Sequence, residues 1–162
     1  MTLPLAAIDF YNVVLFIHIL SAVAAWGVTF TYPIFVRMAR ARGVADVTYF
    51  IHVAARLGVA VIFPASLLLL ASGITLVIDG PWEFGGDEQK WIDVSMTLLV
   101  VLIVLGPLFF VPQEKKILSI TEGGGGAVAG DLEAKLDRYL LVGRINSLIV
   151  LVVLFLMVTK PF

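Results

Sequence analysis

The side chain best suited to chemistry inside a membrane is His18, which lies within a long apolar stretch near the start of the chain. An imidazole can ligate a metal, carry a proton or donate a hydrogen bond. Ser21, Ala22, Ala25 and Thr29 follow at helical spacing and share its face. Small residues there permit close approach of a helix or a flat cofactor ring. We therefore expect His18 either to hydrogen-bond a neighbouring helix or to act as a ligand for such a cofactor, with a proton relay as a further alternative.

His52 and Arg56 form a second candidate group, because positions i and i+4 of a helix share a face. That face suits an anionic group such as a haem propionate or a lipid phosphate. An interfacial histidine is the simpler alternative. The expected depths of His52 and His18 differ by roughly 15–20 Å, which is too far for both to bind one iron.

Arg144 and Asn146 open the last apolar stretch. Arg144 is expected to extend its guanidinium to the headgroups, because this avoids burying a charge. If it points inward it needs an anionic ligand or an acidic partner, and Glu114 is one candidate. The predicted cofactor site therefore consists of His18, Arg56, Arg144 and His52.

Four apolar stretches position these residues: 10–36, 57–78, 94–111 and 139–158. About 20 apolar residues span a hydrocarbon layer of about 30 Å, so each stretch is long enough to cross a bilayer. Hydrophobic residues make up 60% of the chain and charged residues only 14%, against about 25% charged in a soluble domain. The sequence predicts an all-α bundle of four transmembrane helices, forming a single domain over residues 1–162.

The loops predict the orientation. The first and third carry most of the basic residues, and the second is acidic, so the first and third are expected in the cytoplasm and both termini outside. Gly43 is expected to end the first basic turn, and Asp79 to Pro81 to end the second helix. Pro64 and Pro107 are expected to kink their helices.

Composition excludes several classes of function. The chain has no Cys, which rules out disulfides, thiolate metal sites and iron–sulfur clusters. Its net charge of −1 gives no basic face for nucleic acid. The predicted spans contain no acidic residue and no duplicated half, so transport has little support.

The residues Phe16 to Gly27, Arg144-Ile-Asn146 and Lys160-Pro161 resemble a family of uncharacterised bacterial integral membrane proteins. That family is similar in turn to HemJ-type protoporphyrinogen oxidases and CopD-type copper-resistance proteins. The resemblance implies a four-helix core in a bacterial inner membrane, with a His in the first helix followed by Trp and Gly. It also implies a haem-related role for His18.

Two main hypotheses follow. The first is a haem b or porphyrin-related redox protein that uses His18 as a metal ligand, with Met96 or Met157 as the second ligand, a five-coordinate iron, or His18 shared across a homodimer. The second is a non-enzymatic accessory subunit of a larger respiratory or photosynthetic membrane complex. The other hypotheses are an enzyme of the HemJ type and a small transporter. Whether the protein is an enzyme stays open.

Overall fold

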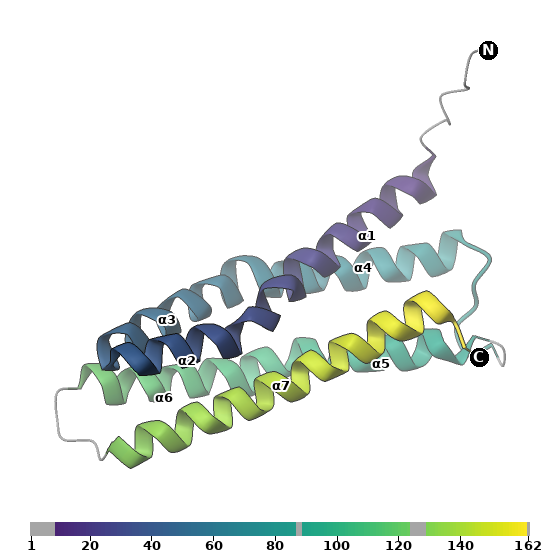
Figure 1. The fold of residues 1–162 in the computed structure, drawn as a ribbon. Helices are drawn as coiled ribbons and strands as arrows, with labels where there is room; N and C mark the ends of the chain where they lie inside the picture. The colour runs from purple at the N-terminus through teal and green to yellow at the C-terminus, as the bar shows by residue number, and fades with distance from the viewer. Residues whose placement is uncertain (1–8, 87–88, 124–128, 162) are drawn as a thin grey trace, which may run out of the picture.

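A computed structural model describes residues 9–86, 89–123 and 129–161. The described residues form four long helices (Figure 1), three of which change helical type near their middle. In chain order the segments are α1 (Phe10–Trp26), η1 (Gly27–Thr31), α2 (Tyr32–Arg42), α3 (Val44–Leu57), η2 (Gly58–Ile62), α4 (Phe63–Asp79), α5 (Lys90–Leu105), η3 (Gly106–Phe110), α6 (Val111–Glu122) and α7 (Ala129–Thr159). All four helices are long and apolar enough to cross a membrane, which confirms the predicted all-α, four-span fold.

The helices extend well beyond the predicted apolar stretches, because the polar segments between them are also helical. The first two helices are separated only by Gly43, whose φ of 122° is a conformation that glycine adopts easily. The second helix ends at Asp79, as expected. Residues 87–88 of the acidic second loop lie outside the described residues.

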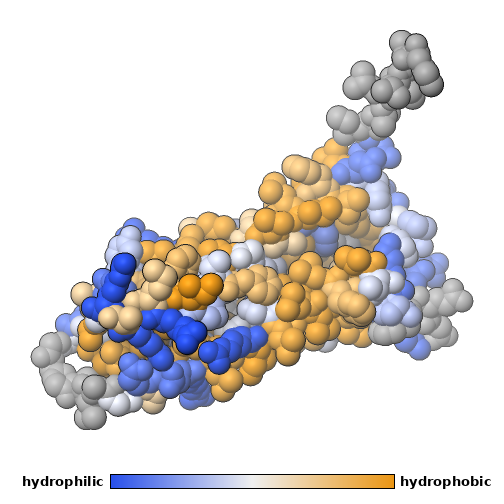
Figure 2. Space-filling model, in the orientation of Figure 1, coloured by the Kyte–Doolittle hydropathy of each residue, from blue (hydrophilic) through white to orange (hydrophobic). Residues whose placement is uncertain are grey.

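The start of α1, the end of α7 and the α4–α5 connection lie at one end of the bundle (Figure 1). We call this the outer end, following the predicted orientation, and the end that holds Arg42 and Glu122 the inner end. Figure 2 shows a broad hydrophobic band between two more polar ends. Large apolar side chains such as Phe16 and Leu148 are more than half exposed, so they fit contact with lipid better than contact with water.

Three clusters of buried side chains follow one another along the bundle. The outer cluster contains Trp91 and Leu156, the middle cluster contains Trp26 and Val150, and the inner cluster contains Ile117 and Tyr139. Polar contacts join helices at both ends. At the inner end the Arg40 guanidinium lies 2.8 Å from Asp137 and 3.4 Å from Glu133, while at the outer end the Lys160 ammonium lies 4.2 Å from the centre of the Trp82 ring.

The second and third helices each contain a π-helical turn beside a proline. The Phe63 amide donates to the Gly58 carbonyl, and the Val111 amide donates to the Gly106 carbonyl, each five residues back. Pro64 and Pro107 have no N–H, so an upstream carbonyl in each helix loses its usual donor. A π-helical turn therefore lies beside each of the two prolines at which a kink was predicted.

Candidate functional site

A cavity of about 360 Å³ lies between the middle and inner clusters, with walls from all four long helices. Trp26 of the middle cluster and Tyr139 of the inner cluster both line it. The three irregular turns line it too, through Thr29 of η1, Gly58 of η2 and Gly106 of η3. Helical irregularities of this kind often occur at functional sites. Here they share one level of the bundle.

Three glycines contribute to the open space. A Cβ atom built on Gly58, Gly106 or Gly143 would meet nothing within 4 Å outside its own helix backbone. All three residues line the cavity, and they come from three different helices. Each missing side chain therefore leaves room beside the cavity that a neighbouring group does not fill.

The polar side chains of the cavity gather around Glu114. This residue is 7% exposed, and its carboxyl group accepts a hydrogen bond of 3.0 Å from the Tyr139 hydroxyl. The Tyr32 hydroxyl is buried and has no hydrogen-bond partner among the described residues. Asn146 is 5% exposed and also lines the cavity. Buried polar groups normally find partners, so an unpaired hydroxyl beside a cavity indicates a place for a ligand or water.

Most of the remaining lining is apolar or aromatic, including Leu102, Ile103 and Phe110. Thr29 and Ser66 also line the cavity, and their hydroxyls donate to the carbonyls of Trp26 and Ile62. Glu114 supplies the one carboxyl group, and within the described residues no Lys, Arg or His lines the cavity. The transport hypothesis was disfavoured because no acidic residue was expected in a span. In the structure the third helix continues through Glu114 and buries it, because α6 packs against α3 and α7 there.

The cavity is partly open at its side. Three of its lining residues are exposed on the surface of the bundle: Val59 of η2, Phe63 at the start of α4, and Pro107 of η3. The exposed fraction is 70% for Val59 and 43% for Phe63. These residues lie in the middle part of their long helices.

His18 lies outside this cavity, in the contact between α1 and α4. Its Nδ1 atom is 3.1 Å from the Ser72 hydroxyl, which is itself 2.7 Å from the Leu68 carbonyl. Because the hydroxyl has one proton and donates it to the carbonyl, it accepts from Nδ1–H, which leaves Nε2 as the atom with a lone pair. A Cβ on Gly73 would lie 3.1 Å from the His18 ring and 4.0 Å from the Met96 sulfur. The His18 ring therefore faces α4, and it can approach that helix closely because Gly73 has no side chain.

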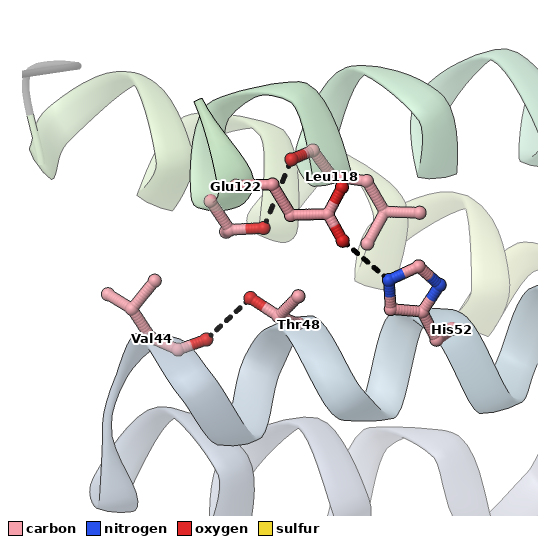
Figure 3. A network of polar contacts seen from close by, with 6 residues as sticks. Val44, Thr48, His52, Leu118 and Glu122 are labelled. Atoms are coloured by element: carbon pink, nitrogen blue, oxygen red, sulfur yellow. Dashed lines mark hydrogen bonds and ion pairs between the residues drawn. The ribbon is translucent and has the colours of Figure 1, made fainter. Parts of the chain in front are cut away.

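His52 lies at the inner end, as predicted, and pairs with the end of α6 (Figure 3). Its Nε2 atom is 2.6 Å from Glu122, and both side chains are about half exposed. In the same view the Thr48 hydroxyl donates to the Val44 carbonyl one turn earlier. This contact ties α3 to α6 at the surface, so His52 already has a structural partner.

The structure does not bring the predicted cofactor residues together. Arg56 and Arg144 are exposed, and Glu114 bonds to Tyr139 rather than to Arg144. Arg56 is 16 positions before Ser72, or roughly 24 Å along its helix, so it lies far from His18. Met96 is the predicted partner that does lie beside His18. Among the described residues, no group of three His, Cys, Asp or Glu side chains is placed to hold a metal ion.

Sequence reasoning missed Tyr32 and the cavity role of Glu114 and Tyr139. A signal was present, because Tyr139, Gly143 and Asn146 recur at spacings of four and three and share one helix face. Asn146 was instead interpreted as part of a resemblance motif. Only the arrangement of four helices turns these separate features into one site.

Comparison with protein families gives a match over residues 12–161 to a family described as predicted integral membrane protein, DUF2269. No curated protein and no solved structure matches the chain significantly.

Proposed function

The chain belongs to the DUF2269 family of predicted integral membrane proteins, and from this premise we propose that it binds a lipophilic small molecule inside the bilayer. The ligand occupies the cavity between the middle and inner clusters. Its apolar body lies against the side chains around Leu102, and its polar end lies near Glu114 and Tyr32.

The observation that carries this proposal is an apolar cavity with a few polar groups converging at one part of it. Ligand pockets usually measure about 300–1,000 Å³ and have this composition. The volume of about 360 Å³ lies within that range. Tyr32 lines the cavity, and its buried hydroxyl has no hydrogen-bond partner among the described residues. A tightly packed structural bundle would instead fill the space beside Gly58, Gly106 and Gly143.

The position of the opening supports a ligand that is dissolved in the membrane. Val59 and Phe63 reach the surface in the apolar part of the bundle, so a molecule passing them comes from lipid. A lipophilic compound is concentrated there and reaches the cavity without crossing either polar end.

Binding is tested by tryptophan fluorescence of the full chain in phosphatidylcholine nanodiscs, with 4-bromobenzyl alcohol as the probe. Bromine quenches nearby indole rings, and Trp26 lines the cavity whereas Trp82 and Trp91 lie at the outer end. We expect saturable quenching that Trp26→Phe removes and that Gly143→Leu, which fills the cavity, weakens at least tenfold. Quenching that rises linearly, or that is unchanged in both variants, would refute the proposal.

A second candidate function is haem binding at His18, favoured by the hydrogen bond that fixes its Nδ1–H on Ser72. Metal-ligating histidines commonly donate one ring N–H in this way and bind the metal with the other nitrogen. Met96 lies close enough to be considered as the second ligand. The donor chemistry therefore fits a b-type haem, which would supply one-electron redox chemistry. The proposed haem site does not include Arg56, Arg144 or His52, because these residues lie away from His18.

The absorption spectrum of protein expressed with ample haem tests this candidate. A Soret band that His18→Ala abolishes would support it, with Ser72→Ala shifting the band or weakening the retention of haem. Equal spectra for wild type and His18→Ala would end the haem proposal and leave the cavity proposal untouched.

The remaining proposals concern location and assembly. We propose a bacterial inner membrane, with both termini outside, and keep an accessory-subunit role or a homodimer as the alternative to an independent binding protein. Native electrophoresis in mild detergent separates these alternatives, because a lone monomeric band would count against a complex.

A further inference from the structure

Resting on the binding function above, we infer that the polar end of the ligand carries a positive charge, as in a protonated or quaternary amine. The charges and aromatic rings that surround the cavity favour such a group. The class of ligand is then a lipophilic cation rather than any lipophilic molecule.

The charge balance of the lining excludes an anionic head group. Glu114 is acidic, and among the described lining residues no Lys, Arg or His is available to pair with a carboxylate, sulfate or phosphate. In a medium of low dielectric constant, a buried anion without a partner is very costly. Fatty acids, phospholipid head groups and porphyrin carboxylates are therefore poor fits for this end of the cavity.

The same surroundings favour a cation. A carboxylate is the natural partner for a buried ammonium group, and only 7% of the surface of Glu114 is exposed. The Tyr139 hydroxyl bonds to Oε1 of Glu114, which leaves Oε2 for the ligand.

Aromatic rings add to this preference. Trp26, Tyr32, Phe110 and Tyr139 all line the cavity, and they come from the first, third and fourth long helices. The rings of Phe110 and Tyr139 pack edge to face at 5.4 Å between centroids. The faces of such rings attract cations within about 6 Å, and groups of rings recognise quaternary ammonium ligands. A carboxylate beside several rings is therefore a site for an organic cation rather than for a neutral polar group.

Three probes with the same bromophenyl ring test the inference in nanodiscs of zwitterionic lipid. They are 4-bromobenzyltrimethylammonium, 4-bromobenzyl alcohol and 4-bromophenylacetate. Quenching of Trp26 gives each affinity, and empty nanodiscs correct for partitioning. We expect the cation to bind at least tenfold more tightly than the alcohol, and the anion to show no saturable binding.

Glu114→Gln keeps the shape of the side chain and removes its charge, while Glu114→Asp keeps the charge. We expect Glu114→Gln to weaken cation binding at least tenfold and to change alcohol binding less than threefold, and Glu114→Asp to retain the preference for the cation. If Glu114→Gln does not fold, the ratio of cation affinity to alcohol affinity in the wild type and in Glu114→Asp tests the inference. Equal affinity for cation and alcohol would overturn the inference but keep the binding function, whereas no saturable binding of any probe would overturn both.

Discussion

Replacing Gly143 with leucine should stabilise the protein, although the site lies in the interior of a helix bundle. A Cβ at Gly143 meets nothing within 4 Å, and the residue lines the cavity. Glycine is about 0.8–1 kcal/mol less favourable than alanine within a helix, and leucine ranks close to alanine. Each well-placed pair of heavy atoms contributes about 0.1–0.2 kcal/mol, so the three carbons beyond the Cβ, with roughly five neighbours each, add on the order of 2 kcal/mol. The expected gain in the free energy of unfolding is therefore about 3 kcal/mol.

Reversible unfolding in mixed micelles, followed by circular dichroism, measures this gain. Gly143→Ala is the matched control, because it changes the helix propensity but fills little space, and we expect it to gain about 1 kcal/mol. If Gly143→Leu is less stable than Gly143→Ala, the leucine must be forcing neighbours apart, which would refute the argument that open space lies beside Gly143.

Three further predictions concern individual contacts, each measured by the same unfolding assay. Tyr139→Phe should lower the free energy of unfolding by about 1–3 kcal/mol, because the buried Glu114 carboxyl loses its donor; an unchanged value would mean that the bond does not form. Ser72→Ala should cost about 0.6 kcal/mol, and less than 2, because it removes the partner of His18 within the membrane; the same change in a His18→Ala background should cost nothing. Lys160→Met should cost about 0.5–1 kcal/mol through loss of its contact with the Trp82 ring, and no loss would show that the C-terminal end is not held there.

The number and approximate position of the membrane-crossing helices could be predicted, because twenty apolar residues in a row have few other structures open to them. Gly43 and Asp79 ended their helices where the turn residues indicated. The helix ends were harder. Segments such as Arg37 to Arg42 are polar enough to read as loops, yet the helix continues through them because Arg40 pairs with Asp137 of α7.

The candidate site could be predicted only in part. His18 was recognised as an inward-facing side chain, and its position against Ser72 agrees with the expected hydrogen bond to a neighbouring helix. The cavity was not predicted, because its walls come from four helices whose rotation about their axes is set by packing. Glu114 lies just beyond the apolar stretch, so its burial depends on Tyr139, a residue 25 positions away.

The most direct test is an experimental structure with 4-bromobenzyl alcohol bound, in which anomalous scattering locates the bromine atom. We predict a bromine peak between the residues Trp26, Gly58, Gly106 and Gly143, with the hydroxyl directed toward Glu114. A bundle whose side chains close this space, or bromine found only on the lipid-facing surface, would contradict it.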